Sequence, residues 1–187
     1  MTDNLLPFPG NEPPDGLVSS LEALLFASGA PVSLRQLAEV LEVEPAAVRG
    51  GLAALSRACD SRGVELLEVA GGWQLRTRPE HASSILRLMG QRPAKLSRAA
   101  LEVLAVVAYR QPVTRAEIDG LRGVDSGGVV RTLLGRGMLR TAGRRDEPGR
   151  PLTYATTRAF LELFALPDLR DLPTLRERED LDEDGLP

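Results

Sequence analysis

The side chains that could move protons, bind metal or hold phosphate are few in this chain of 187 residues. His81 is the single histidine, and it follows Pro79 at the start of a predicted helix, so we expect a solvated surface residue. No Ser-His-Asp set can be assembled around it. Lys95 is the single lysine, and it does not belong to the Gly-Lys-Ser/Thr loop that would cradle a nucleotide phosphate. The sequence therefore predicts no catalytic residue and no cofactor-binding residue, and the chain is not expected to be an enzyme.

Two further features resemble sites for redox chemistry or metal. Cys59 is the only cysteine, so it cannot form an internal disulfide, and its helical Ala/Leu surroundings predict a small buried hydrophobe. Residues 180–185, Asp-Leu-Asp-Glu-Asp-Gly, match the first half of a calcium loop. The bidentate glutamate of such a loop would stand at its twelfth position, which falls beyond Pro187, so we expect a solvated acidic segment and no metal site.

Charge is segregated along the chain more strongly than the total of −3 indicates. Residues 1–16 carry −3, residues 17–90 carry −1, residues 91–160 carry +7 and residues 161–187 carry −6. A basic segment between acidic ends could meet nucleic acid, an acidic protein surface or the acidic tail of its own chain. No basic region precedes an apolar stretch at the beginning, and the longest apolar segment is interrupted at Glu102, so neither export nor a membrane span is expected.

The chain also contains an internal repeat with an offset of about 81 residues. Pro31-Val32 recurs as Pro112-Val113, and each pair is followed by a capping box, Ser33 with Gln36 and Thr114 with Glu117. The other repeated positions are Leu21-Glu22 with Leu101-Glu102, Leu24 with Leu104, Val43 with Val124, Val48 with Val129, and Leu52 with Leu133. Two related modules are therefore predicted.

Each module is predicted to consist of three helices, a β-hairpin and a closing helix, which is the order of a winged helix. In the first module the helices are expected at 17–28, 33–41, 45–58 and 79–89, and the strands at 64–69 and 73–77. In the second module a helix follows Ser97, further helices are expected at 114–122, 126–135 and 157–164, strands at 138–142 and 152–156, and an extended segment at 166–173. The helix after Ser97 has almost no polar face, so we expect it to be enclosed on several sides.

The predicted fold class is mainly α with small β-hairpins, arranged as tandem winged-helix domains. The expected organisation is a flexible leader at 1–16, an N-terminal domain at 17–90, a C-terminal domain at 91–165, and an extended segment with an acidic disordered tail at 166–187. One alternative is a winged-helix transcription regulator that binds DNA. The third helices weigh against it, because residues 45–51 and 126–132 offer small residues with one arginine each and no Asn or Gln that could read bases.

Two runs of residues carry a family resemblance. The run from Ala99 to Val124, AALEVLAVVAYRQPVTRAEIDGLRGV, and the run from Gly149 to Phe164, GRPLTYATTRAFLELF, followed by Leu172-Pro173, resemble the signature of segregation and condensation protein B. The resemblance spans about residues 17–174. Ala155 and Ala165 depart from it, because glycine is common at both positions in the family.

The resemblance implies a non-enzymatic cytoplasmic protein that associates with the nucleoid and forms a homodimer through its first module. It also implies a partner, a kleisin subunit of the segregation and condensation protein A type, which bridges the heads of a structural maintenance of chromosomes (SMC) ATPase. The complex condenses and segregates the chromosome. No membrane contact is implied.

The candidate binding residues lie in three groups. Two turns and the second wing are expected to contact the kleisin through Tyr109, Arg110, Gln111, Pro112, Arg122, Gly123, Val124 and Arg150. Of these, Tyr109 and Val124 are expected to fill the core, whereas Arg110, Arg122 and Arg150 suit pairing with carboxylates of a partner. The first helix is expected to form the dimer through Leu17, Leu21, Leu24 and Leu25. Arg144 and Arg145 could contact DNA without sequence specificity, although arginines at a hairpin tip are more often simply hydrated.

Overall fold

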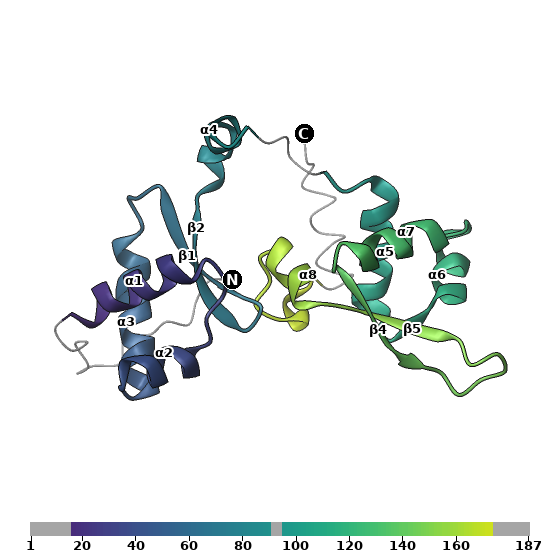
Figure 1. The fold of residues 1–187 in the computed structure, drawn as a ribbon, viewed down its shortest axis with the longest axis horizontal. Helices are drawn as coiled ribbons and strands as arrows, with labels where there is room; N and C mark the ends of the chain where they lie inside the picture. Colours follow the sequence, from purple (N-terminus) through teal and green to yellow (C-terminus); the bar gives the residue numbers. More distant parts are fainter. Residues whose placement is uncertain (1–15, 91–94, 174–187) are drawn as a thin grey trace. The chain divides into compact units, whose positions relative to one another are not determined.

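The computed structural model describes residues 16–90 and 95–173. The chain divides into two compact units, residues 1–93 (unit 1) and 94–187 (unit 2) (Figure 1). The predicted leader apart from Gly16, residues 91–94 and the acidic tail, including the calcium-like segment, lie outside the described residues. Within the described ranges, no helix is both long and apolar enough to cross a membrane.

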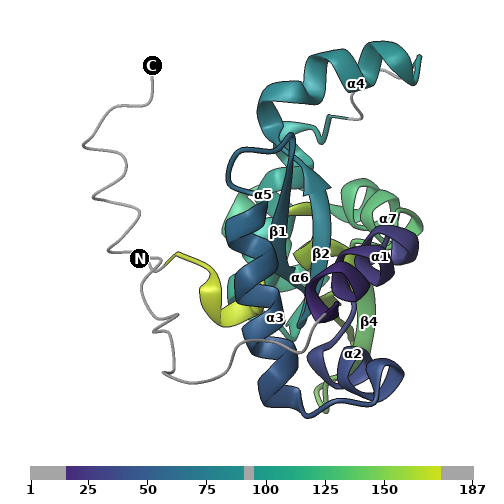
Figure 2. The same cartoon turned by 90° about the vertical axis from the view of Figure 1, so that its left-hand side faces the viewer.

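Three helices form the larger part of unit 1: α1 (Leu17–Ser28), α2 (Leu34–Leu41) and α3 (Pro45–Ala58). Their ends follow from local chemistry, because Gly29 adopts the left-handed conformation after α1 and Pro45 occupies the first position of α3. The predicted capping box forms at α2, where the Ser33 hydroxyl accepts from the Gln36 amide and the Gln36 side chain accepts from the Ser33 amide. Figure 2 shows α3 running beside the hairpin that follows it.

The first wing is a hairpin of β1 (Val64–Val69) and β2 (Gly72–Thr77). Ala70 and Gly71 make its turn with positive φ angles, as a two-residue hairpin requires. Val32 adds an isolated bridge to Trp73, and a Cβ on Gly72 would lie 2.9 Å from the Val32 carbonyl, so only glycine allows this approach. A 3₁₀ turn (Pro79–His81) and α4 (Ala82–Leu88) follow, and His81 is exposed.

The core of unit 1 forms between its helices and its hairpin. Cys59 belongs to this core, and burial raises the pKa of its thiol, as expected of a structural cysteine. The other buried core residues are Leu17, Leu21, Leu25, Leu37, Ala38, Val48, Leu52, Leu55 and Leu66.

Unit 2 repeats the arrangement with α5 (Arg98–Arg110), α6 (Arg115–Arg122) and α7 (Gly127–Gly135). Its capping box joins Thr114 and Glu117 at the start of α6. The second wing is the hairpin of β4 (Leu139–Arg144) and β5 (Leu152–Thr156), and a bulge between Thr141 and Gly143 interrupts its register. A short strand, β3 (Val113–Thr114), was not predicted; it pairs with β5 and gives the order β3-β5-β4.

The end of unit 2 differs from its prediction. After α8 (Arg158–Leu163), residues 166–173 were expected to be extended, but Leu169–Asp171 form a 3₁₀ turn capped by the Asp168 side chain. The leucines of this segment, Leu166, Leu169 and Leu172, pack against the unit 2 core. Ala165 has a φ of 53°, so this turn forms with an alanine in the conformation that favours glycine. Ala155, the other departure from the family pattern, is a buried strand residue.

The prediction that the helix after Ser97 is enclosed on several sides is wrong. One face of α5 packs on the core through Val103, Leu104 and Val107. The opposite face is exposed along Leu101, Ala105 and Tyr109, with Leu101 43% exposed. The apolar composition of α5 therefore predicted burial on all sides, but in the structure only one face of the helix is buried.

Candidate partner-binding surfaces

Arg145 joins the loop end of the second wing to the helical part of unit 2. Its Nη1 lies 2.6 Å from Oε1 of Glu117 and 3.5 Å from Oε1 of Glu147, and its Nη2 donates to the Pro112 carbonyl at 3.0 Å. The wing, the turn after α5 and the start of α6 are thereby held together. Contact between Arg145 and DNA stays a prediction, and it would require this network to open.

Glu117 is held ionised by the same network. Arg145 and the amide and hydroxyl of Thr114 donate to its carboxylate, and together they lower its pKa to about 2. The carboxylate therefore serves the fold by capping α6 and anchoring the wing.

The turn after α5 contains both engaged and free side chains. Gln111 is engaged, because its Oε1 accepts from the Thr156 amide at 2.7 Å and from the Thr156 hydroxyl at 3.1 Å. Pro112 and Arg110 are exposed, and the Arg110 guanidinium has no polar partner among the described residues. Gln111 is therefore placed to fix the turn, while Arg110 and Pro112 form its outer surface.

Arg122 is a structural residue in this fold. Its side chain is 8% exposed; Nη1 donates to the Ser126 hydroxyl at 2.7 Å and Nη2 lies 3.1 Å from Oε2 of Glu102. This contact also lowers the pKa of Glu102. Because the Arg122 guanidinium is bound to Ser126 and Glu102 of its own unit, it is not available to pair with a partner.

Tyr109 and Val124 are not core residues, so the prediction of their burial is wrong. Tyr109 is 41% exposed and its hydroxyl donates to the Pro173 carbonyl at 2.6 Å. Val124 is 55% exposed beyond Gly123, which ends α6 in the left-handed conformation. Tyr109 lies near the end of α5 and Val124 just after the end of α6. At such positions the sequence alone does not show whether a side chain points toward the core or toward solvent.

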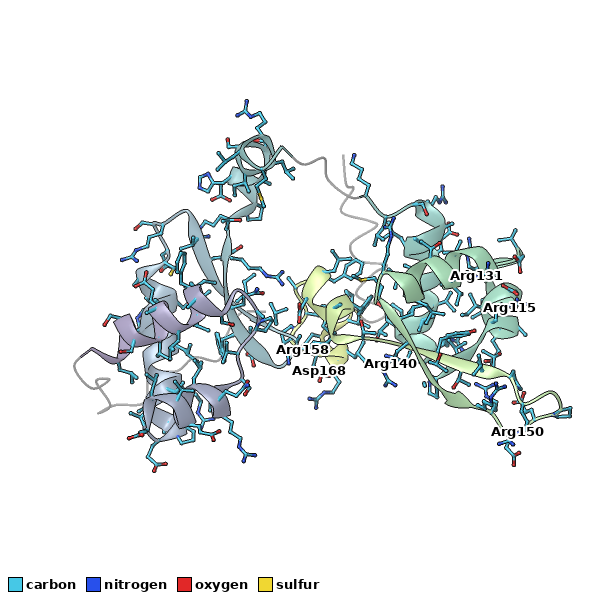
Figure 3. All side chains as sticks on the ribbon, in the orientation of Figure 1. Arg115, Arg131, Arg140, Arg150, Arg158 and Asp168 are labelled. Atoms are coloured by element: carbon cyan, nitrogen blue, oxygen red, sulfur yellow. The ribbon has the colours of Figure 1, made fainter. Side chains whose placement is uncertain are left out.

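The predicted kleisin residues therefore separate into two places on unit 2. Pro112 and Arg150 lie at the wing, beside Arg144 and Arg145, the two residues predicted to contact DNA; Arg144 donates to the Arg150 carbonyl and Arg145 to the Pro112 carbonyl. Arg122, Gly123 and Val124 lie at the opposite end of α6, about 12 Å of helix away. Figure 3 shows Arg150 in the wing, apart from Arg115 on α6 and Arg131 on α7.

In unit 1 the predicted dimer residues face inward. Leu17, Leu21 and Leu25 are buried in the core of their own unit, and Leu24 packs partly buried against it. The same helix exposes another face, on which Phe26 is 83% exposed. Ser19, Ala23 and Phe26 recur at helical spacing along this face. This spacing could have indicated a second face of α1, but the prediction considered only the leucines.

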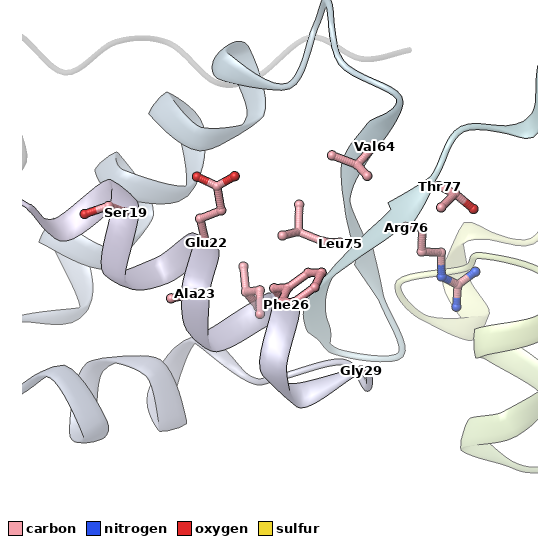
Figure 4. A pocket seen from close by; sticks show the side chains of 10 residues that line it. Ser19, Glu22, Ala23, Phe26, Gly29, Val64, Leu75, Arg76 and Thr77 are labelled. Carbon is pink, nitrogen blue, oxygen red and sulfur yellow. The ribbon is translucent and has the colours of Figure 1, made fainter. Parts of the chain in front are cut away.

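Phe26 borders a groove of about 690 Å³ between α1 and the hairpin β1–β2 (Figure 4). Leu75, Val64 and Thr77 line its strand side, and Ser19, Glu22 and Ala23 line its helix side. Two charged residues line the groove, Glu22, which is paired with Arg62 at 3.0 Å, and Arg76; most of the remaining lining is apolar. A concave apolar site with an exposed aromatic rim is suited to a protein partner.

The described residues offer little reactive chemistry. Among them, no group of three or more His, Cys, Asp or Glu side chains could hold a metal ion. The third helices, α3 and α7, expose small residues and arginines. The structure thus adds no base-reading side chain in favour of the transcription-regulator alternative.

Two units, each with three helices and a wing, define a tandem winged-helix protein that is mainly α-helical with small β-hairpins. Residues 19–175 match the family model described as segregation and condensation complex subunit ScpB. The chain belongs to the segregation and condensation protein B family.

Individual relatives agree with this assignment. Segregation and condensation protein B of Syntrophotalea carbinolica is 55% identical over 90% of this chain and 87% of the relative, and that of Moorella thermoacetica is 48% identical over 87% and 85%. The crystal structure of ScpB from Mycobacterium tuberculosis is 41% identical, covers 81% of this chain and 96% of its own, and has a TM-score of 0.39. The family resemblance noted in the sequence is confirmed.

Proposed function

We propose that this chain is a non-enzymatic accessory subunit of an SMC–kleisin complex, acting in the cytoplasm at the nucleoid as a homodimer that binds the kleisin. Membership of a family described as a complex subunit supports the proposal. One structural observation carries it: large apolar side chains are exposed on both units, among them Phe26 on unit 1 and Val124 on unit 2. The ATP chemistry of the complex belongs to its ATPase, and this chain contributes shaped surfaces.

Self-association is assigned to the groove of unit 1. A second copy would place its own α1 face against Phe26, Ala23 and Leu75, so that each copy buries the aromatic ring of the other. The buried leucines Leu17 and Leu21 take part indirectly, by holding α1 in place.

Sedimentation equilibrium tests this assignment with a matched pair of variants. Phe26→Glu is expected to convert the dimer to a monomer, because it places a charge in an apolar contact. Val40→Glu is the control, since Val40 is an exposed apolar residue of α2 outside the groove, and it is expected to remain dimeric. A monomeric wild type, or a dimeric Phe26→Glu variant, would contradict the assignment.

Kleisin binding is assigned to the exposed members of the predicted set on unit 2. Arg110, Pro112, Val124 and Arg150 present side chains to solvent, whereas Gln111 and Arg122 hold the turns from inside. The guanidinium groups of Arg110 and Arg150 have no polar partner among the described residues and can pair with carboxylates of the kleisin.

A pull-down with the purified kleisin subunit tests this second assignment. Val124→Asp is expected to weaken binding about tenfold or more, which corresponds to roughly 1.4 kcal/mol. Leu163→Asp on α8 is the control, since Leu163 is similarly exposed but lies outside both turns, and it should bind as wild type does. Equal binding by wild type and Val124→Asp would remove this surface from the model of the complex.

A further inference from the structure

The exposed face of α5 is an apolar stripe with charged ends. Leu101, Ala105 and Tyr109 follow one another at intervals of four residues, and all three are exposed. Arg98 begins the helix with its side chain 95% exposed, and it pairs with Glu102 on the same helix at 3.1 Å. Lys95 is exposed just before it. Neither β-strand nor loop covers this stripe within the described part of unit 2.

Pro173 lies at the Tyr109 end of the stripe. Leu166, Leu169 and Leu172 pack on the unit 2 core, and the Tyr109 hydroxyl then holds the Pro173 carbonyl at 2.6 Å. Residues 174–187 therefore begin beside the C-terminal end of α5. From Tyr109 to Arg98 the helix measures about 16 Å, which about five extended residues can span.

In residues 174–187 the basic residues come first and most of the acidic residues follow. This order suits a segment that starts at the C-terminal end of α5 and runs toward its basic N-terminal end. Residues 174–178 carry +1 and residues 179–184 carry −5, whereas the described residues 95–173 carry +4, from 13 basic and 9 acidic side chains. A chain that leaves Tyr109 and runs along α5 brings its acidic block to Arg98, Lys95 and the positive end of the helix dipole. Leu175 supplies an apolar contact for the stripe.

We propose that the acidic segment 174–187 docks on the exposed face of α5 in its own chain, antiparallel to the helix. The docked segment covers Leu101 and Ala105 and neutralises part of the basic charge of unit 2. Any partner that uses this face must displace the segment, so the contact acts as a built-in competitor. The inference depends on the charge order and the Tyr109–Pro173 anchor, and it is independent of the function proposed above.

Paramagnetic NMR on the full chain tests the docking. A nitroxide on Arg178→Cys leaves the leucines and all acidic residues intact, and the native Cys59 is buried and resists labelling. The amide signals of Arg98 to Ala105 are expected to lose intensity when the nitroxide is oxidised and to recover when it is reduced. High salt should also restore them, because the contact is partly ionic.

Two controls separate the occupants. The same tag in a chain whose acidic residues 177–184 are changed to Asn and Gln should cause no loss on α5. A mixture of tagged unlabelled chain with untagged labelled chain should also show none, because the segment docks on its own chain. Loss of signal in the mixture would assign the face to a second copy, and unaffected α5 signals in the tagged chain would show a segment in solvent; either result overturns the proposal.

Discussion

Replacing Arg122 by alanine should unfold unit 2 more easily without any direct effect on a partner. The change removes a charged hydrogen bond to the buried Ser126 hydroxyl, worth about 1.5–3 kcal/mol. The pair with Glu102 adds little, because Glu102 is half exposed and water replaces the lost contact. We expect a loss of about 2–3 kcal/mol, or roughly 10–20 °C in the melting temperature of a unit of this size.

Urea unfolding of the full chain can isolate this effect. Trp73 is the only tryptophan and lies in unit 1, so its fluorescence follows that unit, while circular dichroism follows both. Arg122→Ala should move the unfolding transition of unit 2, seen by circular dichroism, to lower urea concentration. The transition seen by Trp73 fluorescence should stay unchanged. Arg131→Ala is the control, because the Arg131 guanidinium is exposed and has no polar partner in the described range, and it should change stability by less than about 0.5 kcal/mol.

Coincident unfolding curves for wild type and Arg122→Ala would refute the structural role of this arginine. If that variant also failed to bind the kleisin, the original expectation of a direct contact would be restored.

Three further predictions follow from local geometry. Glu117→Gln should lower stability at neutral pH by about 0.5–1 kcal/mol, because Arg145 loses a half-exposed partner; since folding depresses the pKa of Glu117 to about 2, its contribution is present above pH 4.5 and fades as the pH falls toward 2, so denaturant titrations of wild type and variant should converge in acid. Gly72→Ala should cost about 2–3 kcal/mol, as measured by Trp73 fluorescence, because the new methyl group meets the Val32 carbonyl; an unchanged midpoint would mean that the hairpin yields easily. Ala165→Gly should stabilise unit 2 by about 0.5–1 kcal/mol in thermal unfolding by relieving the positive φ, and a destabilised variant would contradict this account.

Much of the fold was predictable because its signals are local. The capping boxes at Ser33 and Thr114, the glycine after α1 and the period-two pattern of the first wing each involve residues within one or two turns of chain. The internal repeat then indicated that both halves share one architecture. The short strand β3 escaped prediction because two residues carry no periodicity.

The binding surfaces were predicted less well, because exposure is a property of the packed unit. Leu25 and Phe26 are neighbouring apolar residues on one helix, yet one is buried and the other is 83% exposed. Arginine type and turn position favoured Arg122 as a contact residue, but its partner Glu102 lies 20 residues earlier in the sequence. No local pattern reports such a pairing.

The sequence by itself determined the helices, the wings, the duplication and the family, since backbone conformation and capping depend on neighbours along the chain. Only the tertiary structure decided which arginines are free and which apolar side chains face outward. Arg145 meets Glu117 across 28 residues, and Tyr109 meets Pro173 across 64. Those contacts depend on how the elements pack, and packing is set by the whole unit at once.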